Sequence, residues 1–236
     1  MTTLARRIAR FDWREIETSL DLQGYATLPG LVTPQQCQAL AALYRDDANF
    51  RSRVVMERHA FGVGEYKYLR YRLPPLVEEL RQTCYQRLVP VANRWRRLLR
   101  EGGTLPQDLD AYLRECRSAG QTQPTPLILK YEAGGYNCLH QDLYGERVFP
   151  LQMTVLLSAS GRDFTGGEFL LVEQRPRAQS KAEVVPLAQG DAVVFAVRHR
   201  PAQGKRGPYR VTLRHGVSRI AAGERYTLGV IFHDAR

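Results

Sequence analysis

The sequence predicts an α+β protein, with a mainly helical first half and a mainly β second half. Two patterns of apolar residues lead to this prediction. In the first half, apolar side chains recur every three or four residues, which is the spacing of a helix with one buried face. From Leu127 onward, short runs rich in Val, Leu, Phe and Tyr are separated by Gly, Pro, Asn and Asp. Many closely spaced strands of this kind are typical of an antiparallel sandwich or barrel.

The first predicted elements are a short strand at residues 25–28 and a helix that begins at Pro34. Thr33 is a favourable N-cap, and Gln36 completes a capping box with it. Proline also suits the first position of a helix, because its missing N–H would have no helical partner there.

A long helix is predicted within residues 73–103, and a shorter one from about Pro106 to Cys116. The long helix has a single apolar stripe, formed by Leu76, Leu80, Cys84, Leu88, Val91, Trp95 and Leu98. Pro90 is expected to kink this helix or to split it in two, because proline cannot donate a helical hydrogen bond.

Seven runs in the second half are predicted to be strands, at residues 127–135, 149–160, 166–174, 182–187, 190–197, 209–220 and 225–232. The chain has 236 residues, which fits one large domain or two small ones. We expect a single domain, in which residues 1–125 form a largely helical support and residues 126–236 form the β core.

The composition indicates a soluble cytoplasmic protein. The four cysteines, Cys37, Cys84, Cys116 and Cys138, form no C-x-x-C pair, so we expect reduced thiols rather than a zinc ribbon or a disulfide framework. The N-terminus lacks the apolar core of a signal peptide, and no apolar run approaches the roughly 20 residues that span a bilayer.

The net charge is +10, from 34 Lys and Arg residues against 24 Asp and Glu residues. Such a charge suits an anionic substrate, an anionic cosubstrate, nucleic acid or an acidic partner protein. Solvated surface arginines without any partner explain it equally well.

A candidate metal site begins in the stretch "CLHQDLYG". His140 and Asp142 are separated by one residue, so an extended backbone would direct both side chains to the same side. His215 lies 75 residues later, and Arg225 follows it by ten residues at the start of an apolar run. Two histidines and one carboxylate form the facial triad of non-haem Fe(II) oxygenases. The planar guanidinium of an arginine nearby would suit a carboxylate of a diacid cosubstrate.

His199 is an internal competitor of His215, because Arg210 follows it at nearly the same spacing. We prefer His215, since apolar strand patterns flank both it and Arg225, whereas His199 lies in a stretch with the pattern of a loop. His59 and His233 are expected to be structural or surface residues.

With these residues in view, the segment from Leu127 to Asp234 resembles the catalytic domain of the Fe(II)/2-oxoglutarate-dependent oxygenases, in particular the prolyl 4-hydroxylase-like branch. The matching pattern is H-x-D, a distal histidine and a basic residue about ten positions later. The runs "GGEFLLVE" and "QGDAVVF" are similar to the strands between those motifs. The resemblance implies a double-stranded β-helix, or jelly roll, with supporting N-terminal helices.

The resemblance also implies roles for individual residues. His140, Asp142 and His215 would bind Fe(II), and Arg225 would bind 2-oxoglutarate, with Tyr131 near the cosubstrate. Thr154 is a candidate for assisting Arg225. Two further residues are singled out by position: Tyr136 lies near the metal pair, and Arg219 stands where prolyl hydroxylases commonly have proline. The resemblance therefore implies oxygenase chemistry rather than specificity for proline.

The implied activity is hydroxylation of a C–H bond in a protein side chain, amino acid or small molecule, with O2 consumed and succinate and CO2 formed. An anionic molecule or a peptide would fit as the unidentified substrate. A nucleic-acid oxidative demethylase on the same scaffold is a less favoured alternative; the aromatic and basic run "GEYKYLRYR" would suit it. A non-catalytic jelly-roll binding module is a third alternative.

The run "RHRPAQGKRGPYR" is predicted to be a mobile loop between two strands, close to the substrate entrance. It extends from Arg198 to Arg210 and is strongly basic. Its Gly and Pro residues indicate an irregular excursion, which could contact an anionic substrate or could simply be solvated.

Overall fold

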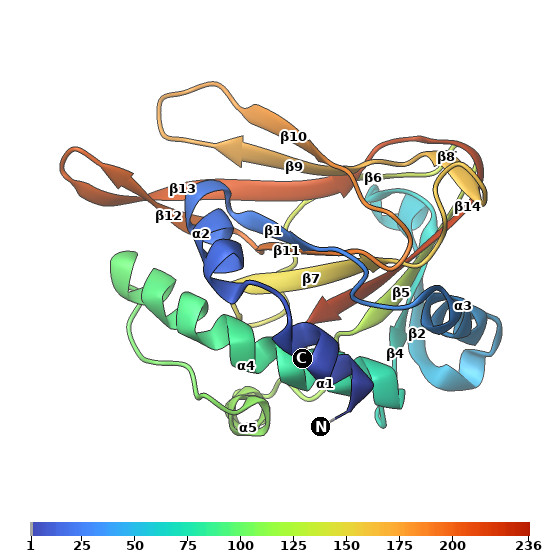
Figure 1. The fold of residues 1–236 in the computed structure, drawn as a ribbon, viewed down its shortest axis with the longest axis horizontal. Coiled ribbons are helices and arrows are strands. Elements are labelled where there is room, and N and C mark those ends of the chain that lie inside the picture. Colours follow the sequence, from blue (N-terminus) through green and yellow to red (C-terminus); the bar gives the residue numbers. More distant parts are fainter. Residues whose placement is uncertain (1) are drawn as a thin grey trace.

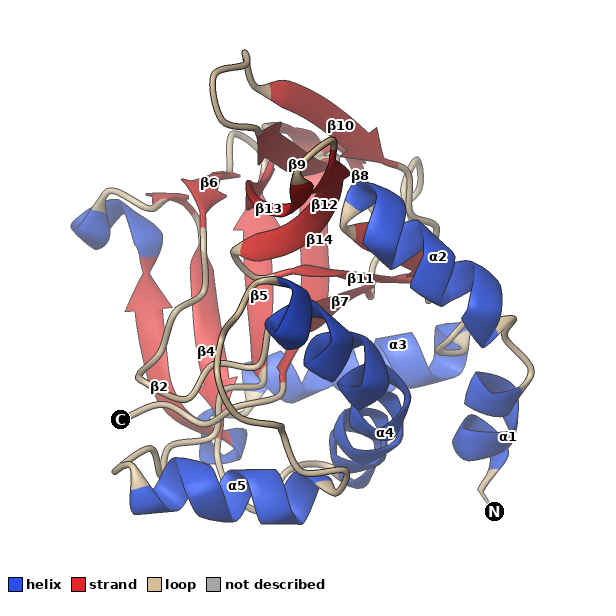
Figure 2. Ribbon diagram, turned by 90° about the vertical axis from the view of Figure 1, so that its left-hand side faces the viewer, coloured by secondary structure: helices blue, strands red, loops and turns tan. Residues whose placement is uncertain are grey.

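The computed structural model describes residues 2–236 as two antiparallel β-sheets, with helices on the outer face of the larger sheet. Figure 1 shows the smaller sheet above the larger one and helices α1, α4 and α5 below it. Figure 2 shows the same helices grouped to one side of the strands. The predicted fold class, a mainly β core with supporting helices, is confirmed.

The described residues form the α-helices α1 (Thr3–Ala9), α2 (Trp13–Gln23), α3 (Pro34–Ala42), α4 (Pro75–Leu98) and α5 (Leu109–Ser118). The strands are β1 (Tyr25–Leu28), β2 (Phe50–Val55), β3 (Gly62–Val63), β4 (Glu65–Leu69), β5 (Leu127–Glu132), β6 (Tyr136–His140), β7 (Leu151–Leu156), β8 (Phe164–Gly166), β9 (Phe169–Gln174), β10 (Lys181–Val185), β11 (Ala192–Ala196), β12 (His199–Gly204), β13 (Gly207–Val217) and β14 (Ile220–Ile231).

The larger sheet has the order β1-β11-β7-β14-β5-β4-β2, with β8 paired to β14. The smaller sheet has the order β10-β9-β13-β6-β3, with β12 paired to β13. Side chains alternate between the two faces of a strand. Along β7, Leu151, Met153 and Val155 therefore join the core between the larger sheet and the helices. Gln152 and Thr154 face the smaller sheet.

Several sequence predictions hold at the level of single elements. Each of the seven predicted runs overlaps a strand. The capping box of α3 is present, since the backbone N–H of Gln36 donates to Thr33 Oγ1 (3.2 Å) and the Gln36 side chain accepts from the backbone N–H of Thr33 (3.0 Å). Strand β1 and helix α3 begin where the sequence placed them.

Other features differ from the prediction. Strands β2, β3 and β4 lie within the first half and were not predicted, and β1, β2 and β4 belong to the larger sheet. Helix α4 is not split at Pro90, which was one of the two outcomes expected there, and the proline side chain lies on its exposed face. Leu98 is also exposed, at 40%, because it lies at the C-terminal end of that helix.

The basic run from Arg198 to Arg210 is not an irregular loop. It forms the β12–β13 hairpin, and the Arg200 side chain is buried in an ion pair with Glu173. Eight residues of β13 separate the hairpin turn at Gly207 from His215, which is roughly 25 Å of extended strand. Regular strand pairing therefore carries the tip of this segment away from His215, whereas the sequence analysis expected the segment to lie close to the substrate entrance.

Among residues 2–236, no helix has both the length and the apolar character that crossing a membrane would need.

A buried ion pair connects the C-terminal segment to helix α4. Arg81 Nη2 lies 2.7 Å from Asp234 Oδ1, and Tyr71 donates to Asp234 Oδ2 at 2.7 Å. We expect Arg81→Met to lower the free energy of unfolding by about 3–5 kcal/mol, because it leaves the Asp234 carboxylate buried without its cation. Urea unfolding would measure this, with the exposed Arg97→Met as a control. Unchanged stability in Arg81→Met would contradict it.

Candidate metal centre

Strand pairing brings the two predicted histidine ligands together. His140 ends β6 and is the direct cross-strand partner of His215 on β13. Asp142 lies two residues beyond the end of β6, where the chain leaves the sheet. The two histidines are 75 positions apart in the sequence, yet this strand register places their rings 4.1 Å apart, centroid to centroid.

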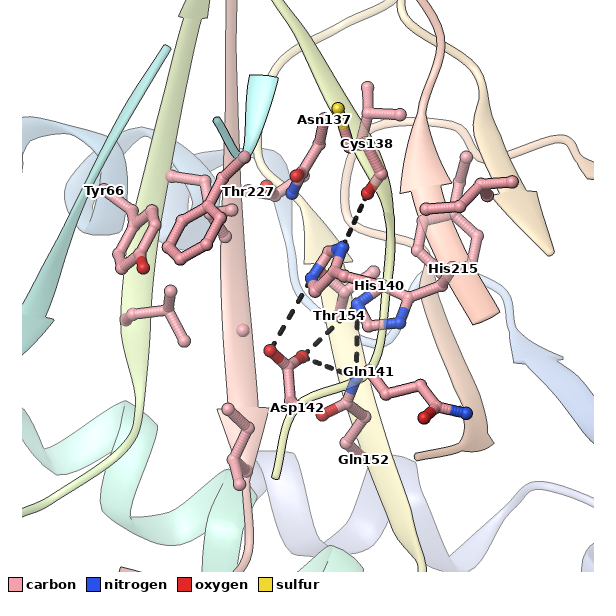
Figure 3. A pocket seen from close by; sticks show the side chains of 18 of the residues that line it. Tyr66, Asn137, Cys138, His140, Gln141, Asp142, Gln152, Thr154, His215 and Thr227 are labelled. Atoms are coloured by element: carbon pink, nitrogen blue, oxygen red, sulfur yellow. Dashed lines mark hydrogen bonds and ion pairs between the residues drawn. The ribbon is translucent and has the colours of Figure 1, made fainter. Parts of the chain in front are cut away.

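The three side chains converge on one point (Figure 3). One ligand atom from each of His140, Asp142 and His215 lies within 4.8 Å of the others. Asp142 Oδ1 is 3.6 Å from His140 Nε2, and Asp142 Oδ2 is 3.3 Å from His215 Nε2. Two imidazole nitrogens and a carboxylate oxygen are a donor set that suits Fe(II).

The neutral His140 ring has a preferred tautomer. Its Nδ1 lies 2.8 Å from the carbonyl oxygen of Cys138, which can only accept, so Nδ1 carries the proton. The lone pair is then on Nε2, the atom that faces Asp142. Cys138 contributes through its backbone, a contact that the sequence did not reveal.

The electrostatics favour an ionised Asp142 carboxylate beside a neutral His215 ring. Burial lowers the pKa of His215, and the neighbouring His140 lowers it further. Burial alone would raise the pKa of Asp142, but the hydrogen bond with His215, with smaller contributions from His140 and Tyr144, holds it well below its usual range. These are the protonation states that metal binding requires.

Two residues that the sequence analysis did not select contact the Asp142 carboxylate. Tyr144 Oη donates to Oδ1 at 2.7 Å, and Gln152 Nε2 donates to Oδ2 at 2.9 Å. Gln152 Nε2 also lies 3.4 Å from His215 Nε2 (Figure 3). A polar residue inside the apolar run "LQMTVLL" was the available signal for Gln152, and proximity to H-x-D was the signal for Tyr144.

A cavity of about 330 Å³ lies between the two sheets and contains the three residues. Its walls are mostly apolar and aromatic. Phe169 and Phe195 pack against the His215 ring, with centroids 6.0 and 4.7 Å away. Phe61 and Leu139 also line the cavity and are about half exposed, at 47% and 45%, which places apolar groups where the cavity meets solvent.

Arg225 lines the same cavity from β14, next to Tyr131 on β5 in the strand register. Arg225 is 1% exposed, and its Nε and Nη1 have no hydrogen-bond partner within residues 2–236. Burial lowers its pKa to about 10. An unpaired buried guanidinium is costly unless an anion joins it.

The other cosubstrate candidates are close by. Tyr131 is fully buried, and Arg225 Cζ lies 5.8 Å from the centre of its ring. Thr154 and Thr227 both line the cavity, and Thr154 Oγ1 donates to the carbonyl oxygen of Leu228 at 3.3 Å. Thr227 was not selected from the sequence, although its spacing of two from Arg225 on a strand directs both to the same face.

The remaining histidines lie elsewhere. His199 is on β12, where its Nδ1 lies 3.4 Å from Thr212 Oγ1, and it belongs neither to the cavity lining nor to the metal-binding group of the described chain. His233 is fully buried beside Tyr144, while the exposed His59 stacks on Phe61 at 5.3 Å. The preference for His215 over His199 agrees with this geometry.

Residues 64–235 match the model of the family Oxygenase-NA, which is described as "Oxygenase, catalysing oxidative methylation of damaged DNA". The chain belongs to the Oxygenase-NA family. It is therefore an enzyme, an oxidoreductase of the oxygenase class. A relative in Mycobacterium tuberculosis, the uncharacterized protein MT2286, is 50% identical over 163 residues, which is 69% of this chain and 70% of that protein.

Solved structures show that this Oxygenase-NA member has the fold of the 2-oxoglutarate oxygenases. The epimerase SnoN from nogalamycin biosynthesis is 14% identical with a TM-score of 0.56, covering 92% of this chain and 80% of SnoN. A Trichoplax adhaerens prolyl hydroxylase is 12% identical with a TM-score of 0.53, covering 97% and 92%. A Pseudomonas putida prolyl-4-hydroxylase is 16% identical with a TM-score of 0.50, covering 95% and 99%. The resemblance drawn from the sequence is confirmed.

Proposed function

We propose that this protein is an Fe(II)- and 2-oxoglutarate-dependent oxygenase that hydroxylates a C–H bond, with His140, Asp142 and His215 as the metal ligands. The observation that carries the proposal is the convergence of two imidazoles and one carboxylate on a single point of an apolar cavity. Three protein ligands on one side of a metal leave positions for a cosubstrate and O2.

Arg225 is proposed to bind the distal carboxylate of 2-oxoglutarate. Arg225 lines the cavity that contains the triad, and two of its guanidinium nitrogens have no partner among residues 2–236, so a carboxylate would satisfy both charge and hydrogen bonding. Tyr131 would pack beside the cosubstrate, and Thr154 or Thr227 could add a hydroxyl contact from the same cavity wall.

When bound, iron with 2-oxoglutarate and O2 supplies the oxidising power, and succinate and CO2 are the co-products. The chain contributes ligation, orientation and exclusion of water. His140 and His215 present ring nitrogens, Asp142 presents its carboxylate, and the aromatic walls at Phe169 and Phe195 keep bulk solvent from the reacting centre.

Two substrate classes are supported by different observations. The half-exposed apolar residues at the entrance, Phe61, Leu139 and Leu143, suit an uncharged part of a protein side chain or a small molecule. The description of the Oxygenase-NA family favours damaged DNA, and the net charge of +10 is compatible with a polyanion. The stacked pair of His59 and Phe61 could also contact a nucleobase.

Product analysis distinguishes the two classes. Hydroxylation of an N-methyl group gives a hemiaminal, which breaks its C–N bond and releases formaldehyde, whereas hydroxylation of a carbon skeleton leaves the added oxygen on the product. Purified protein with Fe(II) and 2-oxoglutarate is expected to form succinate faster with its substrate class than without it. Assays would compare peptides, amino acids and single-stranded DNA that contains N-methylated bases.

Three results of these assays would decide between the proposals. Equal amounts of formaldehyde and succinate with methylated DNA would establish the nucleic-acid class, and a mass increase of one oxygen in a peptide or amino acid would establish the other. Failure to bind Fe(II), with no succinate under any condition, would contradict the oxygenase proposal itself. Unmethylated DNA of the same sequence is the matched control.

A further inference from the structure

The Asp142 carboxylate is held by two donors from different parts of the fold. Tyr144 Oη donates to Oδ1 from the same loop, and Gln152 Nε2 donates to Oδ2 from β7 of the larger sheet. The distances are 2.7 and 2.9 Å, so each carboxylate oxygen accepts one hydrogen bond from outside the triad.

We infer that Tyr144 and Gln152 are positioning residues, which fix the plane of the Asp142 carboxylate for metal binding. The inference rests on the proposed metal centre and goes beyond it, because neither residue is a proposed ligand. Asp142 lies outside β6, so sheet hydrogen bonds do not orient it as they orient His140 and His215. Hydrogen bonds from side chains therefore orient the Asp142 carboxylate, because strand-to-strand hydrogen bonds do not reach it.

Gln152 carries the stronger part of this inference. It is 2% exposed within the buried strand β7, and its Oε1 has no hydrogen-bond partner in the described chain. The amide orientation is set by its partner, because a carboxylate accepts and cannot donate. An unpaired buried acceptor lowers stability, so a glutamine is better explained here by what its N–H donates to.

Packing fixes the position of the Tyr144 hydroxyl. The Tyr144 ring lies edge-on to Tyr68, with centroids 6.1 Å apart, and it is tilted against His233 at 6.1 Å. A ring held on two sides places its hydroxyl with little freedom. Tyr144 and Gln152 therefore restrain Asp142 from both ends of the carboxylate, as donors around a metal ligand commonly do.

The test uses Co(II) binding, followed through the visible absorption of the bound ion in the full-length protein. Tyr144→Phe and Gln152→Met remove each donor while keeping similar shape and size. Each is expected to weaken Co(II) binding about tenfold to hundredfold and to alter the absorption spectrum, which reports ligand geometry. The metal-free melting temperature should stay close to wild type, since Gln152→Met removes an unsatisfied oxygen together with the donor.

Tyr85→Phe is the matched control. It also removes a buried tyrosine hydroxyl, one that donates to the carbonyl oxygen of Pro106 at 2.7 Å and is not among the residues lining the cavity. Its Co(II) affinity and spectrum should equal those of wild type. Gln152→Leu, which lacks the donor but has another shape, should reproduce Gln152→Met if loss of the donor is the cause.

Failure of this inference differs from failure of the metal proposal. If His140→Ala and Asp142→Ala lose Co(II) binding while Tyr144→Phe and Gln152→Met bind with wild-type affinity and spectrum, the positioning role is wrong and the ligand set stands. If the variants lose affinity only in proportion to a fall in metal-free melting temperature, the two residues are structural. If Asp142→Ala binds Co(II) as wild type does, the metal proposal fails first.

Discussion

Replacing His140, Asp142 or His215 by alanine is expected to abolish succinate formation, with or without substrate. Each substitution removes one of the three proposed metal ligands, whose donor atoms lie within 4.8 Å of one another. We expect a loss of at least roughly a thousandfold in rate, equivalent to about 4 kcal/mol in activation free energy. Succinate release and Fe(II) binding, measured on the same preparations, would check it.

His199→Ala is the control for these variants. His199 has the same kind of sequence context, with a basic residue about ten positions later, but it lies on β12 beside Thr212 and outside the cavity lining. Its alanine variant should bind Fe(II) and turn over like wild type. Loss of iron binding in His199→Ala together with its retention in His215→Ala would overturn the proposed ligand set.

Replacing Arg225 by methionine is expected to have opposite effects on the free protein and on cosubstrate binding. In the free protein, Arg225 is buried and two of its nitrogens have no partner among the described residues. Methionine removes this uncompensated charge, so the free energy of unfolding should rise by about 1–3 kcal/mol. Binding of 2-oxoglutarate should weaken by about 1.5–3 kcal/mol, because its distal carboxylate loses a charged partner.

A thermal shift series with Mn(II) and increasing 2-oxoglutarate measures both effects. Wild type should gain stability with ligand concentration by mass action, and Arg225→Met should start higher and gain less. Arg219→Met is the control, since Arg219 is exposed over the Tyr136 ring and does not line the cavity. A ligand-dependent gain in Arg225→Met equal to that of wild type would exclude this role for Arg225.

Much of the β core could be predicted because its strands are apolar and each can be recognised from a short run of sequence. Strands β7 and β11 are buried along their whole length, so their runs of Val, Leu and Met are unmistakable in sequence. Strands β2 and β4 were missed because they carry charged residues. Lys67 of β4 is buried, with its ammonium 2.6 Å from Asp47 and 4.4 Å from the Tyr44 ring centre, an environment that no local pattern shows.

The prediction of an irregular loop for the basic hairpin was wrong for a related reason. Composition alone predicts that arginines are solvated, and Gly and Pro predict irregular backbone. The structure instead pairs His199–Gly204 with β13 and buries Arg200 against Glu173. Burial of an arginine depends on an anion being placed beside it, and here that anion is 27 residues away in sequence.

The sequence by itself determined the types of residue at the candidate site, because ligand chemistry depends on side-chain identity and the H-x-D spacing is local. The tertiary structure decided which of these residues come together in the candidate site. The register of β6 against β13 joined His215 to His140 and left His199 elsewhere. The packing of the two sheets brought the Gln152 amide to the Asp142 carboxylate. It also buried Arg225 with two guanidinium nitrogens that have no partner among residues 2–236. Register and burial arise from cooperative pairing across distant segments, so a single stretch of sequence cannot specify them.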